Sequence, residues 1–250
     1  MFGQNPVRPL ALKDEPLTVH SIFPTIQGEG PWSGFPAVFI RLSGCNLRCH
    51  FCDTEFESGT IMSNSDILKQ VYAAYDTFGA TLGVTRRIVL TGGEPARQDC
   101  TDLIKLLSYN HFAVQVETAG TYFPTWLRAT KTVISPKTRN VHKGFYDNVR
   151  FSDWKYVLRA GDVSPVDGLP LSCTQVYNPD DTTVDTKELA ILSEKHGAPA
   201  RPPSWAAVWL SPMDEGDEVK NAANRRAVAE SCMHFGYRAM LQIHKLMGLD

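Results

Sequence analysis

Three cysteines stand close together in the first quarter of the chain. Cys45, Cys49 and Cys52 have the spacing C-x3-C-x2-C, and no fourth cysteine lies nearby in the sequence. Thiolates are the usual ligands of iron–sulfur clusters, and a [4Fe–4S] cubane takes four ligands. Three cysteines therefore leave one iron open to a small molecule, as catalytic metal sites do. We expect a catalytic [4Fe–4S] cluster at these residues.

Two other interpretations of the cysteine trio stay open at this point. The first is a chance grouping of structural thiols. The second is a zinc site completed by His50 or Asp53. Zinc motifs more often contain two C-x2-C pairs, and only one is present here. The spacing itself, directly after a predicted strand and Gly44, favours the cluster.

A glycine turn supplies the second candidate motif. Thr91, Gly92, Gly93, Glu94 and Pro95 follow a predicted strand. Glycines at such a place let the backbone approach a ligand closely. Taken alone, the motif is more typical of an ordinary strand-to-helix turn.

Apolar segments that alternate with helical patterns must position these motifs. The predicted strands span residues 37–43, 87–90, 112–116, 131–134, 154–158, 206–210 and 237–243. Helices are predicted from residue 65 to Gly79, from 99 to 107, over 186–196 and over 218–235. The segment 160–185 is rich in Pro, Gly and Asp and is predicted to be mostly loop.

This alternation favours an α/β fold. We expect an incomplete TIM-like β/α barrel of about six to seven mostly parallel strands, short of the eight of a full barrel. Chemistry-bearing residues follow several of the strands, among them Cys45, Gly93, Glu117, Ser135 and Ser211. In such folds the functional site lies at the carboxyl ends of the strands.

Composition narrows the class of protein. The chain has 250 residues, 43% of them hydrophobic, and a net charge of −2, which gives no broad positive field for nucleic acid or an anionic membrane. It has no run of about 18 apolar residues that would span a membrane. Residues 1–16 are expected to form a flexible arm without the apolar core of a signal peptide, and residues 17–250 a single domain. The other cysteines, 100, 173 and 232, are scattered, which fits a reducing cytoplasm better than a disulfide framework.

Together, the trio and the glycine turn resemble the signature of the radical S-adenosylmethionine (SAM) superfamily. The resemblance implies that Cys45, Cys49 and Cys52 hold a [4Fe–4S] cluster whose open iron binds SAM. Phe51 matches an aromatic position near the adenine, and Cys52 and Asp53 also belong to the cofactor segment. Gly93 and Glu94 match the turn that receives the methionyl amine of SAM.

Four further stretches resemble one family within that superfamily, the 7-carboxy-7-deazaguanine synthases of queuosine biosynthesis. They are Thr25–Gly30 with Gly34, residues 36–39 and Arg41; Cys52–Thr54; Glu117–Gly120 with Ser135–Lys137; and Leu241–Gly248. The resemblance covers most of residues 19–250 and is weak from about 140 to 207. It implies a lyase that converts 6-carboxy-5,6,7,8-tetrahydropterin into 7-carboxy-7-deazaguanine and ammonia.

The same resemblance implies roles for particular residues. It places Mg²⁺ on Thr54, and SAM additionally on Ser135, Pro136, Lys137 and Ser211. It places the pterin against Ile26, Gln27, Gly28, Glu29, Arg41, Thr91, His244 and Asp250, the last two in a C-terminal tail that closes over the substrate. It also implies a homodimer and an electron donor such as flavodoxin or ferredoxin.

Several of these residues have plainer interpretations. Gln27 and Glu29 suit the donor and acceptor edge of a pterin, yet a solvated turn would contain them too. A guanidinium at Arg41 suits a substrate carboxylate and equally a structural salt bridge. Thr54 could cap a turn, and a lysine such as Lys137 after a strand is usually solvated. Tails commonly fray, but the apolar residues 246, 247 and 249 favour docking.

The chain also departs from the family pattern. Ala119 stands where the family often has Asn, and Ser211 stands where it often has Gln before Pro. Both positions are expected near SAM, so their contacts are open. No role is assigned to residues 140–185. Two rival functions remain at this stage: an activase that installs a glycyl radical on a partner protein, and a non-enzymatic zinc or iron–sulfur module.

Overall fold

A single mixed sheet runs through the protein from its N-terminal to its C-terminal part. The computed structural model describes residues 8, 16–49, 52, 54–77, 86–173 and 197–249. Its strands are β1 (Leu17–Ile26), β2 (Pro36–Leu42), β3 (Thr60–Met62), β4 (Arg87–Gly92), β5 (Ala113–Thr118), β6 (Lys131–Ile134), β7 (Asp153–Leu158), β8 (Ala207–Pro212) and β9 (Arg238–Ala239). Their order across the sheet is β3-β1-β2-β4-β5-β6-β7-β8-β9.

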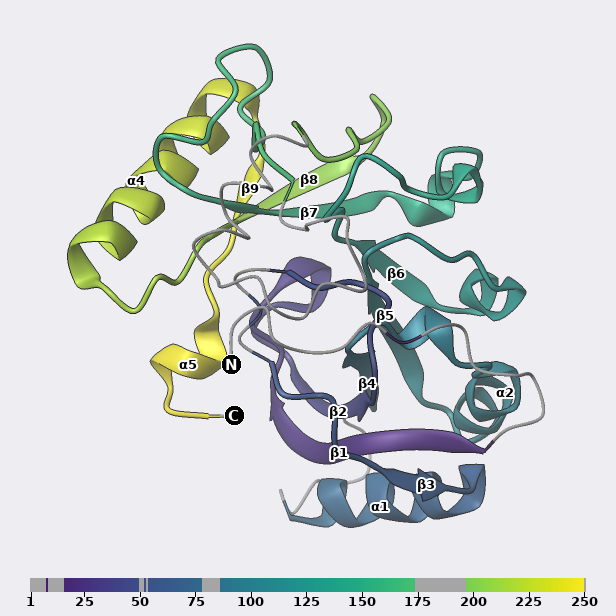
Figure 1. Cartoon of the computed structure of the whole chain (residues 1–250). Coiled ribbons are helices and arrows are strands. Elements are labelled where there is room, and N and C mark those ends of the chain that lie inside the picture. The colour runs from purple at the N-terminus through teal and green to yellow at the C-terminus, as the bar shows by residue number, and fades with distance from the viewer. Residues whose placement is uncertain are drawn as a thin grey trace.

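Seven of these strands form the parallel part of the sheet. From β2 to β9 every neighbouring pair is parallel, whereas β1 pairs antiparallel with both β2 and β3. Figure 1 shows the sheet curving around an interior, with α1, α2 and α4 on its outer side. Because β3 and β9 are its two edges in the described part of the chain, the sheet is an incomplete barrel. The predicted fold class is confirmed.

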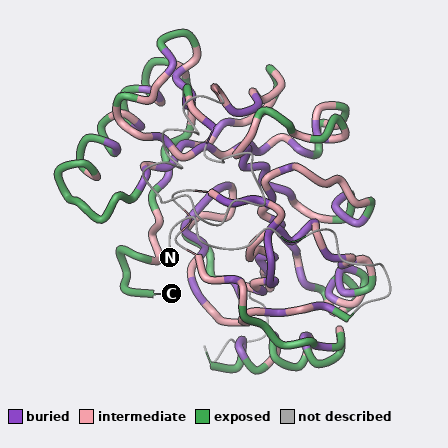
Figure 2. Tube along the Cα trace, viewed as in Figure 1, coloured by how far each residue is buried: buried purple, intermediate pink, exposed green. Residues whose placement is uncertain are grey.

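Alternation along the strands separates the core from the interior of the barrel. Side chains such as Ile40, Leu90 and Val116 are buried in the main hydrophobic core, which also contains residues of α1 and α2. Successive side chains of a strand point to opposite faces, so Arg41 and Glu117 face the interior. Figure 2 shows the strands largely buried, while the outer faces of α1 and α4 are exposed.

The helices begin and end close to the predicted positions. α1 spans Asn64–Asp76 and is capped by Ser63, whose hydroxyl accepts from the amide of Asp66. α2 spans Thr101–Tyr109 and α4 spans Glu218–Phe235. α4 ends where Gly236 adopts a left-handed conformation with φ of 77°, which glycine adopts without strain.

Three strands differ from the prediction, and one of them, the three-residue edge strand β3, was not predicted at all. β1 was not predicted, because its sequence LTVHSIFPTI mixes polar residues and Pro24 into the apolar pattern. The predicted strand over 237–243 is wrong beyond its start: β9 has only two residues, and α5 (Ile243–Leu246) follows. The neighbouring strand β8 ends at Pro212, which has no N–H with which to continue a ladder.

Other predictions fall partly or wholly outside the described residues. The helix predicted over 186–196 lies outside them, as does the N-terminal arm apart from Arg8 and Pro16. Within the described part of the loop segment, residues 160–173 form turns closed by a bridge between Val163 and Pro170. No helix among the described residues combines the length and the apolar character needed to cross a lipid bilayer.

Candidate active site

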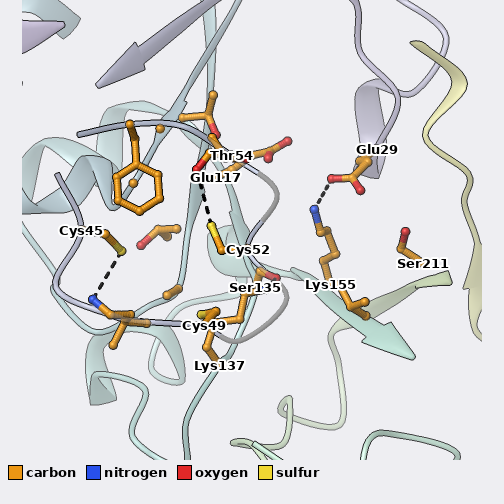
Figure 3. Close-up of a pocket in the computed structure, with 18 of the residues that line it drawn as sticks. Glu29, Cys45, Cys49, Cys52, Thr54, Glu117, Ser135, Lys137, Lys155 and Ser211 are labelled. Carbon is orange, nitrogen blue, oxygen red and sulfur yellow. Dashed lines mark hydrogen bonds and ion pairs between the residues drawn. The ribbon is translucent and has the colours of Figure 1, made fainter. Parts of the chain in front are cut away.

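A pocket opens at the carboxyl ends of the parallel strands, where the sequence predicts the site. Ten of the predicted residues line it: Glu29, Cys45, Cys49, Cys52, Thr54, Thr91, Gly93, Ser135, Lys137 and Ser211. Figure 3 shows the three cysteines on one side of this pocket and Glu29, Lys155 and Ser211 on the other. The site therefore combines a thiol-rich wall with a charged wall.

The cysteine loop begins at Gly44, in a backbone conformation with positive φ that glycine adopts more readily than other residues. Gly44 has φ of 80°, and its amide donates to the carbonyl of Phe56 at 2.8 Å. The amide of Leu47 then donates to Cys45 Sγ at 3.4 Å. Cys45, Leu47 and Phe56 form a small buried cluster against which Cys49 and Cys52 pack. The loop thus holds all three sulfurs near one apolar patch.

Electrostatics show that the three thiols influence one another. Burial raises the pKa of Cys45 well above its usual value, and the charges of Cys49, Glu94 and Cys52 raise it further. Three thiolates here therefore need a positive centre, which an iron cluster supplies. Within the described residues, no three His, Cys, Asp or Glu side chains are grouped so as to hold one metal ion. A cubane binds each thiolate to a different iron, so its ligands need not converge on one point.

The glycine turn packs directly against the cysteine loop. A side chain at Gly93 would put its Cβ 2.1 Å from the carbonyl oxygen of Gly44, and one at Gly92 would meet the carbonyl oxygen of Leu42 at the same distance. Hydrogen bonds tie the two turns together: the amide of Glu94 donates to the carbonyl of Gly44 at 3.0 Å. Only glycines allow this backbone-to-backbone approach, which leaves the pocket open beside Cys45.

Glu94 itself does not line the pocket. Its carboxylate accepts from Thr118 Oγ1 at 2.7 Å and from the amides of Ala119 and Ala96 at 2.8 and 3.0 Å. Burial raises the pKa of Glu94, and these hydrogen bonds oppose that rise. The side chain therefore connects the glycine turn to the turn after β5.

The opposite wall carries two acids and two lysines. Glu29 forms an ion pair with Lys155, and Gln27 Nε2 donates to Glu117 Oε1 at 2.8 Å. Burial alone would raise the pKa of Glu29, but the charge and hydrogen bond of Lys155, together with the charges of Lys137 and His244, outweigh it, and the pKa lies below its usual value. Burial raises the pKa of Glu117, which Lys155 only partly offsets. The ionised form of Glu29 and the neutral form of Glu117 are therefore favoured, although both residues belong to one wall.

Lys137 completes this wall from the turn after β6. Its Nζ donates to Ser135 Oγ at 2.6 Å. Burial, followed by the charge of Lys155, lowers the pKa of Lys137. The predicted Ser135–Lys137 turn thus presents a hydroxyl and an amine to the pocket, with Pro136 between them.

The C-terminal segment packs against the loop that carries Glu29. A side chain on Gly28 would come within 2.3 Å of His244 Nδ1, and the amide of Gly30 donates to Met240 Sδ at 3.2 Å. Gln242 lines the pocket. The apolar residues expected to dock the tail do not do so: Leu246, Met247 and Leu249, at and beyond the end of α5, are exposed. Docking is made by Met240, Gln242 and His244 instead.

The remaining predicted residues lie near the pocket or outside the described chain. Ile26, Gln27 and Gly28 lead into Glu29 but do not line the cavity. Arg41 does not line the cavity either, and its guanidinium lies 5.1 Å from the centre of the Phe23 ring. Phe51, Asp53 and Asp250 lie outside the described residues. Lining residues absent from the predicted site include Arg48, Glu117, Lys155 and Gln242.

Comparison with known proteins agrees with this geometry. Residues 39–134 match the family model of the radical SAM superfamily, and they include the cysteine loop and the glycine turn. A 7-carboxy-7-deazaguanine synthase from Rhodospirillum rubrum is 36% identical over 99% of both chains, and one from Rickettsia prowazekii is 34% identical over 100% of this chain and 96% of the relative.

The chain belongs to the 7-carboxy-7-deazaguanine synthase family.

The fold of this family member also matches a solved structure. The crystal structure of QueE from Escherichia coli superposes with a TM-score of 0.59, covering 90% of this chain and 93% of that one, at 24% sequence identity. As a radical SAM enzyme, this 7-carboxy-7-deazaguanine synthase family member uses a [4Fe–4S] cluster and SAM. The thiol-lined pocket fits that requirement, because a positive cluster compensates the cost of burying the Cys45 thiolate.

Proposed function

We propose that this radical SAM enzyme converts 6-carboxy-5,6,7,8-tetrahydropterin into 7-carboxy-7-deazaguanine with release of ammonia. One observation carries the proposal: the pocket that contains the cysteine trio also has a wall of two acids and two lysines, Glu29, Glu117, Lys137 and Lys155. The amide of Gln27 supports this wall from behind through its hydrogen bond to Glu117. Such a wall matches the alternating donors and acceptors of a pterin edge. The full-length relatives carry the name of this activity.

The chain's own residues divide the work in this proposal. Cys45, Cys49 and Cys52 hold the cluster, with Phe51 and Asp53 in the cofactor segment. Gly93, the Ser135–Lys137 turn and Ser211 form the SAM site, and Glu94 supports it from outside the cavity by connecting the glycine turn to the turn after β5. When bound, the cluster and SAM supply the radical that begins the rearrangement. The remaining residues of the pocket position the substrate, because the reacting atoms have to be held about 3–3.5 Å apart.

The substrate side of the pocket would bind and orient the pterin. Glu29 offers an ionised acceptor, while Thr91 faces the same cavity from the end of β4. Ile26, Gln27 and Gly28 support that wall, and Arg41 is the candidate partner of the substrate carboxylate. His244 and Asp250 belong to the tail that closes over the substrate. The packing of His244 on Gly28 supports this assignment of the tail.

Anaerobic turnover tests the function directly. The purified protein with a reconstituted cluster, SAM, Mg²⁺ and a reductant is expected to form 7-carboxy-7-deazaguanine from the carboxytetrahydropterin, as identified by mass. Turnover without any protein partner excludes the glycyl-radical activase. A colourless, zinc-loaded protein that does not cleave SAM would overturn the proposal in favour of a zinc module.

We also propose that Thr54 binds Mg²⁺ at the edge of the pocket. Its hydroxyl is a hard oxygen ligand of the kind that Mg²⁺ takes together with substrate and water. Thr54 lines the cavity next to Cys52, whose Sγ lies 3.8 Å from the Thr54 carbonyl oxygen. A cation there would sit between the cysteine loop and the substrate.

Replacing Thr54 tests the Mg²⁺ site independently of the iron–sulfur cluster. Thr54→Ala is expected to lower turnover about 10- to 100-fold and to abolish its dependence on Mg²⁺, with the visible absorbance of the cluster unchanged. Thr54→Ser keeps the hydroxyl and should retain Mg²⁺ dependence. Unchanged metal dependence in the alanine variant would contradict the assignment.

The family resemblance extends the proposal to the assembly. We expect residues 17–250 to act as one radical SAM domain within a cytoplasmic homodimer that flavodoxin or ferredoxin reduces. Light scattering of the holoenzyme gives its mass, and turnover with each reduced donor identifies the electron source. A monomer at working concentration would remove the dimer from the proposal.

A further inference from the structure

Lys155, a charged residue of the pocket wall, has no individual role in the function described so far. Lys155 lies in the middle of β7, opposite Trp209 of β8 in register. Its neighbours Trp154 and Tyr156 are buried in the outer core, so the lysine faces the interior of the barrel. Its side chain is only 12% exposed, and it lines the pocket. A lysine is rarely buried to this degree unless it is paired.

The partner of Lys155 comes from the far side of the chain. Glu29 lies in the loop between β1 and β2, 126 residues earlier in the sequence, and its side chain is 11% exposed. In Figure 3 the lysine side chain reaches toward the Glu29 carboxylate across the cavity wall. The loop that carries the acid is thereby connected to β7. Gln27 contributes too, since its Oε1 accepts from the Glu29 amide at 3.1 Å.

The surroundings of the pair point to a binding role more than to a purely structural one. A buried ion pair contributes little net stability, because desolvation offsets the attraction between its charges. This pair also lies in the wall of an open cavity and beside a second carboxyl group, Glu117. A carboxylate accepts several hydrogen bonds, so one pairing with a lysine leaves it able to accept from a ligand.

We propose that Lys155 is a positioning residue that holds the Glu29 carboxylate toward the pocket and thereby selects substrates with a hydrogen-bond donor edge. An amino-substituted pyrimidinone ring, as in a pterin, has such an edge. The inference rests on the proposed function and adds to it the residue that orients the acceptor. The lowered pKa of Glu29, for which Lys155 is the largest opposing influence to burial, agrees with an acceptor that stays ionised.

Substrate kinetics of the reconstituted holoenzyme test the proposal. Lys155→Met is expected to raise the KM for the carboxytetrahydropterin about 10- to 100-fold, the equivalent of one hydrogen bond to a charged group. Its kcat should change by less than about threefold, because the reacting atoms are not involved. The affinity for SAM and the cluster absorbance should stay as in the unmodified enzyme. Lys155→Arg keeps the charge and should recover most of the affinity.

A matched control and a double variant exclude a merely structural effect. Lys131→Met removes a lysine from another ion pair of the same barrel, with Asp153, and should leave the KM unchanged. If Lys155 acts through Glu29, then Glu29→Gln and the double variant with Lys155→Met should have the same KM. Independent, multiplicative effects of the two substitutions would overturn the proposal.

The possible failures are distinguishable. An unmodified holoenzyme that neither binds nor converts the pterin overturns both the function and the role of Lys155. An active enzyme whose KM is unaffected by Lys155→Met overturns only the role of Lys155. If the methionine variant does not fold, Glu29→Gln and Lys155→Arg decide: a normal KM in the first, or no recovery in the second, counts against the proposal.

Discussion

Two carboxylate–lysine pairs face the interior of the same barrel and serve different ends. Asp153 and Lys155 are two residues apart on β7 and point to the same side. Lys155 pairs with Glu29 at the pocket, whereas Asp153 pairs with Lys131 of β6 at 2.5 Å near the start of the strand. Asp153 also accepts from Trp209 Nε1 at 3.0 Å and is 3% exposed.

The difference lies in what surrounds each pair. The Asp153 carboxylate is paired with Lys131 and accepts from the Trp209 indole, and Asp153 is not among the residues that line the pocket. The Glu29 carboxylate, in contrast, borders the pocket and remains available to a ligand. The same chemical pairing therefore stabilises the amino end of the barrel and prepares binding at the carboxyl end, the usual division in α/β barrels.

The largest test of this comparison is the removal of Asp153. Asp153→Ala leaves the half-buried Trp209 N–H without its acceptor and Lys131 without its partner, so we expect a loss of about 3 kcal/mol in the free energy of unfolding. Thermal melting of the anaerobic holoenzyme should show it, while turnover of the folded protein at low temperature stays normal. A variant that melts normally but loses turnover would break the division between the two ends.

A second test concerns the difference between Glu29 and Glu117, the two acids of the pocket wall. Burial raises the pKa of Glu117, so its neutral form is favoured in the folded state and the stability it contributes is lost as pH rises through that raised pKa. Glu117→Gln should therefore melt progressively higher than the unmodified enzyme as the pH is raised from 5 toward 8.5.

Glu29 supplies the opposite control for that series. Its pKa is lowered, so its contribution is already complete above the ordinary carboxyl range and is lost only as the pH falls below it. The melting difference between Glu29→Gln and the unmodified enzyme should stay constant from pH 5 to 8.5. Parallel pH dependence of the two variants would show that the two acids do not differ in charge.

The smallest expected effect concerns Arg238, which packs on the Trp209 ring beside the Asp153–Lys131 pair. The Arg238 guanidinium lies 4.9 Å from the centre of the Trp209 ring, in an exposed position. A cation–π contact of this kind contributes about 0.5–1 kcal/mol. Arg238→Ala should lower the melting temperature by only about 1–4 °C. A loss as large as that of Asp153→Ala would mean that the indole, and not the carboxylate, holds this end together.

Much of the fold could be predicted because its strands are buried on both faces. Continuous apolar runs such as residues 37–40 and 88–90 identify such strands directly. β1 was missed because it is an antiparallel strand with a mixed pattern. β9 was predicted too long because its ladder with β8 has only two residue pairs, and the pattern of residues 237–243 does not show where that ladder stops.

The candidate site was predictable where its residues are adjacent in the chain. The cysteine loop, the glycine turn and the Ser135–Lys137 turn are local motifs, and all three reach one pocket. Lys155 was missed because its partner lies 126 residues away. A signal was nevertheless present: within WKYVL, a lysine alternates with large apolar residues, which places it inside the barrel once the outer face is known.

The contact between the cysteine loop and the glycine turn limits how this scaffold can be re-engineered. Gly93 touches the Gly44 carbonyl, and Gly92 touches that of Leu42, with no side chain between the backbones. Neither turn can be lengthened, swapped or given a side chain without displacing the other. Transplanting the metal loop into a different barrel would therefore require both strand ends to be carried over as one cassette.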